Sequence, residues 1–318
     1  MNTKLDFYSS QSFDPYELLQ KSHEFKKDPF SRSHLGQGKT LGMIFLQKSL
    51  RTRFSMQKAA SNLGCNVLSM SADQDSWLWE FGDEAVMDQD KAEHIKEAAA
   101  VMGRYCDVLA LRSFAGLNDI DADHSDYVFH RFSELCGVPL VNMESSIRHP
   151  LQSLADIMTI DELFSLSKKP RIALSWAPHV KPLPQAVAQS FLEWCKVFGL
   201  EVTVTHPKGY DLSKESMESH RYEPIQQRAI NESDIVYVKN WSMTEPYGSI
   251  SNDFNNWMID EDKISLTEGP HVMHCLPVRR NLVISDSVLD SDRSLVIQEA
   301  ANREWTAQAV LAKILESL

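Results

Sequence analysis

The sequence contains four short stretches whose polar residues could bind an anion and polarise a carbonyl group. The first is Ser49-Leu50-Arg51-Thr52-Arg53, between an apolar run and an amphipathic one. If a helix begins there, its free backbone N–H groups and its macrodipole favour an anion. Arginine guanidinium groups match phosphate oxygens, and the two hydroxyls add donors. The alternative is a serine that caps the helix, with both arginines in solvent.

The second stretch is His149-Pro150-Leu151-Gln152, with Arg148 before it and Glu144 five residues upstream of His149. A histidine and a glutamine three residues apart can face one ligand from the start of a helix. Taken alone, the stretch fits a structural histidine followed by a proline at the first helical position, and that interpretation is then preferred.

The third stretch is His274-Cys275-Leu276-Pro277-Val278-Arg279-Arg280-Asn281. Cys275 is either a catalytic thiol or a small buried residue whose backbone matters more than its sulfur. Because no Cys-His-acid pattern with family-specific neighbours accompanies it, the second interpretation is favoured. The fourth stretch, 299–304, places Arg303 at the start of a helix, where the alternative is a solvated arginine.

Short apolar runs alternate with helical patterns along the chain, which predicts parallel sheets covered by helices. In the first half we predict strands over 41–47, 66–70, 107–111 and 139–143, and helices over 53–63 and 93–102. A helix over 151–164 follows. The second half then carries predicted strands over 171–176, 201–205, 234–239, 272–276 and 295–298, and predicted helices over 185–198 and 302–315.

This order predicts an α/β protein of two doubly wound parallel-sheet domains joined by the helix that begins at Leu151. The predicted domains are 1–150 and 151–301, with the C-terminal helix 302–318 packing back on the first. A chain of 318 residues is long enough for two such cores. Ligands bind at the carboxyl ends of strands in these sheets, so we expect the active site in the cleft between the domains.

Composition excludes several classes of function. Lys plus Arg is 32 and Asp plus Glu is 44, so the net charge is 32 − 44 = −12. Such an acidic chain is a poor partner for nucleic acid or an anionic membrane. The first ten residues do not resemble a secretory signal, and no apolar run approaches the roughly 18 residues that span a bilayer. Five cysteines without a CxxC pair indicate a reduced, cytoplasmic protein.

Cofactor motifs are also missing. Gly36-Gln37-Gly38-Lys39-Thr40 is similar to a phosphate loop, but Ser33 stands where that motif needs glycine, and the stretch precedes a predicted strand. No GxGxxG follows a strand, and neither HExxH nor GxSxG occurs. We therefore expect no metal and no organic cofactor.

Together with Arg112, which follows the predicted strand 107–111, the four stretches resemble the transcarbamylase (carbamoyltransferase) family, in the right order and over essentially the whole chain. Aspartate-type members usually have His-Pro-Leu-Pro in the third stretch, whereas ornithine-type members have His-Cys-Leu-Pro, as here. The resemblance implies that an amine attacks carbamoyl phosphate through a tetrahedral oxyanion and expels phosphate. Such a reaction needs orientation and anion donors rather than a cofactor.

The resemblance also implies roles for the matching residues. Ser49, Leu50, Arg51, Thr52 and Arg112 would cradle the phosphate, and His149 would join Thr52 and Arg112 at the carbamoyl oxygen. Gln152 and the backbone carbonyls of Cys275 and Leu276 would hold the carbamoyl amide and the incoming amine. Pro150, Leu151 and Arg303 would complete the carbamoyl phosphate site. In the family, the loop matching Trp77 reaches a neighbouring subunit's site, which implies a homotrimer; Trp79 is the alternative contact.

The amine acceptor is inferred from Lys239. Ornithine enzymes place an aspartate at that position, which suits the α-ammonium of free ornithine, whereas a lysine would repel it. The resemblance is therefore to the N-acylornithine subfamily, with Glu144, His179, Lys239 and Arg279 as expected acceptor contacts. The alternative for Lys239 is a solvated lysine at a strand end.

The acyl group is inferred from Ala92. The acetylornithine group typically carries glutamate there and the succinylornithine group proline; alanine removes a carboxylate that would repel a succinyl chain. We expect carbamoyl transfer to the δ-amine of N-succinylornithine, giving N-succinylcitrulline in arginine biosynthesis. The alternatives are N-acetylornithine, free ornithine or putrescine as acceptor, and a non-catalytic carbamoyl phosphate sensor.

Overall fold

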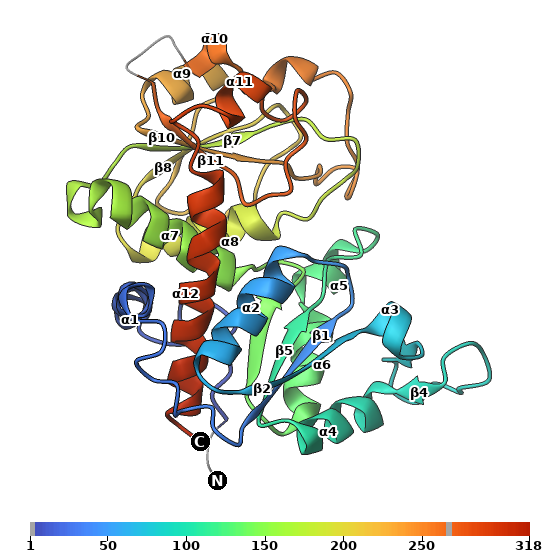
Figure 1. Ribbon diagram of the computed structural model, residues 1–318. Helices are drawn as coiled ribbons and strands as arrows, with labels where there is room; N and C mark the ends of the chain where they lie inside the picture. Colours follow the sequence, from blue (N-terminus) through green and yellow to red (C-terminus); the bar gives the residue numbers. More distant parts are fainter. Residues whose placement is uncertain (1–3, 265–268) are drawn as a thin grey trace. The chain divides into compact units, whose positions relative to one another are not determined.

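The computed structural model describes residues 4–264 and 269–318, and the chain forms two compact units. Unit 1 comprises Met1–Ala115, Asp121–Leu151 and Arg303–Leu318, and unit 2 comprises Gly116–Ile120 and Gln152–Asn302. Figure 1 labels their helices and strands. Within the described residues, no helix has the length and apolar character needed to cross a membrane.

Unit 1 is built on a four-stranded parallel sheet in the order β2-β1-β5-β6. Its inner strands are continuous apolar runs and are buried along almost their whole length, as expected when helices cover both faces. The strands are β1 (Thr40–Phe45), β2 (Asn66–Ser71), β5 (Val108–Arg112) and β6 (Leu140–Glu144). A separate pair joins β3 (Trp79–Glu80) to β4 (Glu93–His94).

Helices of unit 1 lie on both faces of this sheet (Figure 1). α4 and α6 pack Ile95 and Phe132 against Ile44 and Leu109 of the sheet. On α2, Asn62 donates to Gln308 of α12, which ties these two helices together. The helices are α1 (Pro15–Lys27), α2 (Arg51–Asn62), α3 (Ala72–Asp75), α4 (Ile95–Tyr105), α5 (Ile120–His124) and α6 (Tyr127–Cys136).

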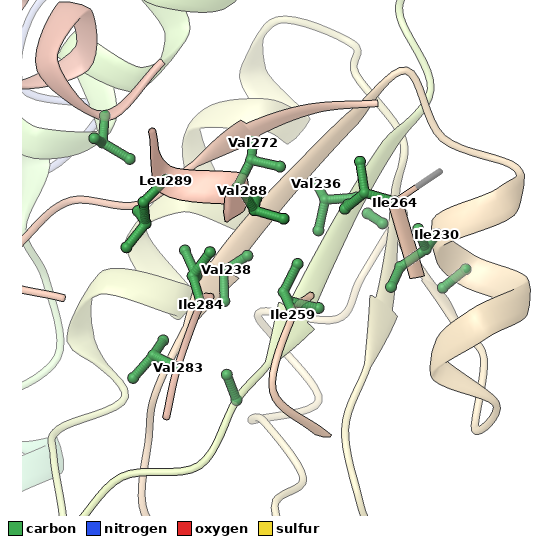
Figure 2. Close-up of a cluster of buried hydrophobic side chains, with 14 residues drawn as sticks. Ile230, Val236, Val238, Ile259, Ile264, Val272, Val283, Ile284, Val288 and Leu289 are labelled. Carbon is green, nitrogen blue, oxygen red and sulfur yellow. The ribbon is translucent and has the colours of Figure 1, made fainter. Parts of the chain in front are cut away.

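Unit 2 holds a five-stranded parallel sheet in the order β11-β10-β7-β8-β9. Figure 2 shows its core, in which Val236 and Val238 of β10 pack with Val272 of β11 and Ile230 of α9. The strands are β7 (Ile172–Trp176), β8 (Val202–Thr205), β9 (Arg221–Tyr222), β10 (Ile235–Lys239) and β11 (His271–Met273). The helices are α8 (Ala186–Val197), α9 (Gln226–Asn231), α10 (Glu261–Ile264) and α11 (Asp286–Leu289), with short 3₁₀ turns at Leu166–Lys168 and Asn255–Trp257.

Each sheet has one point where the strand order reverses. In unit 1 the chain moves outward from β1 to β2 and then returns to the other side of β1 at β5. In unit 2 it moves from β7 to β8 and β9 and then returns beside β7 at β10. Loops diverge at the carboxyl ends of such strand pairs and leave room for a ligand. These points are the ends of β1 and β5, and of β7 and β10.

Two long helices belong to both units along the chain: α7 (Pro150–Phe164) and α12 (Val296–Leu315). The predicted strand over 295–298 is wrong, because the backbone N–H of Glu299 donates to Leu295 O and helix α12 has already begun. Only Ser294, just before it, makes a β-bridge, to Val272. The predicted start of the last helix at residue 302 is therefore six residues late.

Two parallel-sheet α/β domains are confirmed, and most strand ends agree with the predictions within two residues. The strand predicted over 272–276 is shorter, because the chain leaves β11 after Met273. Helix α2 begins two residues earlier than predicted and ends at Asn62, just before Gly64. Gly64 has φ +86°, which stops the helix as predicted. Helices α1 and α6 were not predicted.

Candidate active site

The start of α2 lies at the carboxyl end of β1 and presents backbone donors. Ser49 Oγ accepts from the backbone N–H of Thr52 at 3.2 Å. The first turn holds no acidic residue, so no side chain of the turn neutralises the positive end of the helix dipole. Leu50 is 61% exposed, and Arg51 is half-buried beside it. The turn can therefore receive an anion.

Thr52 joins two arginines that are far apart in the sequence. Its hydroxyl oxygen accepts from Arg112 Nη1 at 3.3 Å and from Arg303 Nη2 at 2.7 Å. All three residues are at least nine-tenths buried. Arg112 ends β5, and Arg303 lies on α12, so the sheet and the last helix of unit 1 together position two guanidinium groups at the start of α2.

Glu144, at the end of β6, is the carboxylate of this cluster. Its Oε2 accepts from Arg112 Nη1 and lies 3.2 Å from His149 Nε2. The Arg112 guanidinium also stacks over the Phe114 ring, 4.3 Å from its centroid, a contact that sequence analysis missed. The structure thus places Glu144 with the predicted phosphate residues of unit 1; its assignment to the acceptor stays a prediction.

Arg53, the second arginine of the first stretch, is held against the sheet. Its guanidinium lies 4.2 Å from the centroid of the Phe45 ring and donates to Ser71 Oγ at 2.6 Å. These contacts give Arg53 a structural place, and anion binding by Arg51 stays a prediction.

The two tryptophans of the predicted loop differ in burial. Trp79 is 7% exposed and packs edge-to-face on Phe132, 5.8 Å between ring centroids. Trp77 is 57% exposed, and its indole N–H donates to Glu93 Oε2 at 2.8 Å. Glu93 follows Ala92, which is exposed. Trp77 and the specificity position are therefore tied to one surface region, whereas Trp79 belongs to the core.

The predicted acceptor residues of unit 2 form a cationic group at the ends of β7 and β10. His179 follows β7, and its Nε2 accepts from Arg279 Nε at 3.2 Å. Because Nε2 accepts, we assign the neutral tautomer with the proton on Nδ1, which lies 2.9 Å from Lys181 O. Burial lowers the pKa of His179, and the charges of Arg279, Lys239 and Lys181 lower it further.

Lys239 is the last residue of β10 and pairs in register with Trp176. It is 8% exposed, and within the described residues its ammonium has no ion pair or hydrogen-bond partner. A ligand carboxylate can pair with this ammonium without displacing a protein partner.

Gln152, one turn into α7, belongs to a fully buried polar cluster. Its amide nitrogen donates to Asp156 Oδ1 at 2.8 Å and to Glu299 Oε1 at 3.2 Å. Glu299 Oε2 accepts from the backbone N–H of His274 at 2.9 Å. Sequence analysis included His274 and Glu299 in its third and fourth stretches without giving them a role, and it missed Asp156. The signal for Asp156 was a polar residue on an otherwise apolar helix face.

Cys275 and Leu276 follow β11 in an unusual backbone conformation. Leu276 has φ +51°, a region that residues with branched side chains rarely adopt and that is found at functional sites. Its N–H donates to His274 Nδ1 at 2.8 Å. Cys275 is buried, at 8% exposure. The turn fixes the direction of the Cys275 and Leu276 carbonyls. Nowhere do the described residues include a cluster of three or more His, Cys, Asp or Glu placed to hold a metal ion.

The sequence profile of the aspartate/ornithine carbamoyltransferase carbamoyl-phosphate-binding domain matches residues 5–162. The profile of the Asp/Orn-binding domain of that family matches residues 184–314. The chain therefore belongs to the aspartate/ornithine carbamoyltransferase family, and it is a carbamoyltransferase.

Two relatives and one solved structure show which carbamoyltransferases this chain is similar to. The chain is 44% identical over 307 residues to an N-succinylornithine carbamoyltransferase of Bacteroides fragilis, covering 96% of each chain. It is 33% identical over 308 residues to an N-acetylornithine carbamoyltransferase of Xanthomonas axonopodis pv. citri, covering 90% of each. A crystal structure of a glutamate-to-alanine mutant of N-acetyl-L-ornithine transcarbamylase, complexed with carbamyl phosphate and N-succinyl-L-norvaline, superposes with TM-score 0.92 at 32% identity, covering 97% of this chain and 99% of that one.

Proposed function

We propose that this chain transfers the carbamoyl group of carbamoyl phosphate to the δ-amine of N-succinylornithine, giving N-succinylcitrulline and phosphate. The observation that carries the acceptor assignment is the unpartnered ammonium of Lys239, on a largely buried side chain, beside Arg279 and neutral His179. N-Succinylornithine has two carboxylates and no α-ammonium, so it matches a group of cations. Free ornithine would bring its own cation to the same group, which is unfavourable at close range.

Unit 1 supplies the proposed carbamoyl phosphate residues. The start of α2 with Ser49, Leu50, Arg51 and Thr52 holds the phosphate, together with Arg112 and Arg303. Charge-assisted hydrogen bonds of this kind are about twice as strong as neutral ones. The bond between Thr52 and each arginine supports the proposal, because it brings both guanidinium groups to the same helix start.

The proposed reaction uses positioning and electrostatics. His149, Thr52 and Arg112 donate to the carbamoyl oxygen, where negative charge develops as the amine attacks. Gln152 and the carbonyls of Cys275 and Leu276 accept N–H groups of the carbamoyl amide and of the amine. The amine attacks in its neutral form. The departing phosphate takes its proton, so no separate protein base is required.

The choice of a succinyl group rests on Ala92. The acetylornithine group carries glutamate at this position, by the resemblance, and that carboxylate would repel the distal carboxylate of a succinyl chain. One structural neighbour that was solved with N-succinyl-L-norvaline is a glutamate-to-alanine mutant. The 44% identity to an N-succinylornithine enzyme supports the same acceptor. The metabolic role that follows is arginine biosynthesis.

A homotrimer in the cytoplasm completes the proposal, with the Trp77 loop contributed to a neighbouring subunit's site. The exposure of Trp77 supports this assignment, since 57% of a large aromatic side chain faces solvent in the single chain. Its bond to Glu93 ties it to the loop that contains Ala92.

The proposal is tested by assaying ureido product with carbamoyl phosphate and three acceptors: N-succinylornithine, N-acetylornithine and ornithine. We expect a strong preference for the succinyl compound. Preference for the acetyl compound would still support Lys239 as the residue that selects an acylated ornithine. It would overturn the choice of a succinyl group from Ala92. Activity on ornithine alone would overturn the acceptor site, and binding of carbamoyl phosphate without turnover on any amine would indicate a sensor.

A further inference from the structure

Asp156 and Glu299 form a carboxyl pair that has no assigned role in the reaction. Both side chains are fully buried, on α7 and α12, in unit 2. The groups that interact with them include the Gln152 amide, the backbone N–H of His274, the Tyr237 hydroxyl and the Cys275 thiol. None of these neighbours is a cation, so two ionised carboxylates could not be accommodated without a large desolvation penalty.

The pair therefore keeps a proton. Burial, followed by the charge of Asp156, raises the pKa of Glu299 well above its usual range. The pKa of the Tyr237 hydroxyl is raised by burial and then by Asp156, so the tyrosine remains a neutral group beside the pair. A hydrogen-bonded acid–carboxylate pair with one shared proton is the lowest-cost state for two such groups.

The pair fixes which way the Gln152 amide points. The two N–H bonds of the amide nitrogen are directed at one oxygen of Asp156 and one of Glu299. The amide oxygen, Oε1, is consequently turned away; it is buried and has no partner among the described residues. Leaving a buried acceptor unsatisfied is unfavourable, and only a donor removes that cost.

We propose that Asp156 and Glu299 are positioning residues that force Gln152 to present an acceptor, so that the site selects a carbamoyl N–H group over a methyl group of the same size. The inference rests on the proposed role of Gln152 at the carbamoyl amide. Carbamoyl phosphate and acetyl phosphate differ in just this group, NH₂ against CH₃. A methyl group cannot donate, so it leaves Gln152 Oε1 unsatisfied.

Glu299 also holds the backbone that follows β11. Its second oxygen accepts from His274 N, and His274 Nδ1 in turn accepts from Leu276 N. The Glu299 carboxyl group thus fixes the orientation of the Gln152 amide. It also fixes the turn that orients the Cys275 and Leu276 carbonyls. All the acceptors proposed for N–H groups of the substrates depend on it.

The test compares the binding of carbamoyl phosphate and of acetyl phosphate to the full chain. Binding is measured by titration calorimetry at low temperature and, for acetyl phosphate, by its inhibition of carbamoyl transfer. Glu299→Gln places a second NH₂ in the cluster, which turns one of the two amides over and removes the acceptor from the substrate. We expect the preference for carbamoyl phosphate over acetyl phosphate to fall roughly tenfold or more. Acetyl phosphate binding should change less than about threefold. Asp156→Asn is the second variant, and it should lower the same ratio.

Glu162→Gln is the matched control. Glu162 also joins α7 to α12, by accepting from Gln298 at 2.8 Å and from Asn302 at 3.0 Å, but it does not contact Gln152. The Glu162→Gln variant should prefer carbamoyl phosphate over acetyl phosphate by the same ratio as the wild type. Equal losses for both phosphates in Glu299→Gln and Asp156→Asn would mean a merely structural role, and an unchanged ratio would also overturn the inference. If the wild type binds carbamoyl phosphate but turns over no acylornithine, the proposed function fails while the binding ratio still tests the pair.

Discussion

Replacing Lys239 by methionine should lower activity and raise stability at the same time. The side chain is 8% exposed, and its ammonium has no partner within the described part of the chain. Methionine keeps a similar unbranched length and removes the charge. A charge-assisted hydrogen bond to a substrate carboxylate contributes about 1.5–3 kcal/mol. At about 1.36 kcal/mol per factor of ten, its loss lowers kcat/KM for the acylornithine roughly 10- to 150-fold.

The stability effect has the opposite sign because the charges of Lys239, Arg279 and Lys181 converge on His179 in the ligand-free protein, and methionine removes one of these like charges. We expect the free energy of unfolding to rise by about 1 kcal/mol or more, which is roughly 2–4 °C in Tm for a unit of this size. Activity is measured as ureido product over a range of acceptor concentrations, and stability by thermal unfolding without substrate. Lys208→Met, at an exposed lysine of the same unit, is the control and should change neither quantity.

Two results would refute the reasoning. A loss of both activity and stability would mean that the Lys239 ammonium makes a structural contact. An activity change below about threefold would mean that it faces solvent. Lys239→Asp adds a test of sign: it should shift preference toward free ornithine, whose α-ammonium then meets a carboxylate. If the order of preference among the three acceptors did not change, Lys239 would not contact the α-substituent of the acceptor.

Three further outcomes follow from the structure. Arg51→Ala should lower kcat at least about 100-fold with little change in the unfolding curve, whereas Arg53→Ala, at the arginine packed on the sheet, should retain far more activity; equal losses would contradict the assignment. Trp79→Ala should cost about 3–5 kcal/mol of stability because Trp79 fills the core, whereas Trp77→Ala should lower activity with less than about 0.5 kcal/mol of destabilisation; the reverse pattern would exchange their roles. Burial lowers the pKa of His206 below its ordinary 6.5, so below pH 6.5 the unfolded chain binds a proton that the folded chain does not. Stability should therefore fall as pH drops through 6.5, and His206→Gln should flatten that slope in urea titrations at pH 5.5, 6.5 and 7.5; a slope unchanged by the substitution would assign it to other groups.

Sequence patterns predicted the strands well where burial leaves little choice. β5 and β6 are buried at every residue, and apart from Asn142 and the polar residues that end them they are apolar, as is typical of strands buried on both faces. The polar residues that end these strands, Arg112 and Glu144, could be placed near a site because parallel strands bring their carboxyl ends to one edge. The family and the enzyme class are confirmed by the family profiles, which match residues 5–162 and 184–314.

Local pattern failed where a tertiary contact decides the structure. The run Leu295-Val296-Ile297 has strand-like residues, yet it enters α12 with Ile297 at 73% exposure and Val296 buried. Helix α6 begins after Asp126, whose left-handed φ of +48° is held by a hydrogen bond from Ser146 N. Helix α1 is different: Asp14 caps it and Pro15 opens it, so its signal was present in the sequence.

The candidate site was predicted as a set of residue types but not as a set of contacts. Asp156 and Glu299 lie 143 residues apart, and nothing in a helical pattern says which polar positions of two helices will meet. Likewise, the pattern shows that Lys239 ends a strand, but it does not show that the side chain is only 8% exposed. Pairing and desolvation are tertiary properties, and they decide how strongly each group acts.

The two units of this acidic chain differ in how their proposed anion-binding cations are paired. In unit 1 the cations are already engaged: Arg112 contacts Glu144 and Thr52, and Arg303 contacts Thr52. A phosphate with close to two negative charges can compete with such contacts, and these contacts keep the guanidinium groups oriented before it arrives. A carboxylate carries one charge and competes less well. The unpartnered ammonium of Lys239 in unit 2 suits that weaker ligand, because no protein contact has to be broken when the acceptor binds.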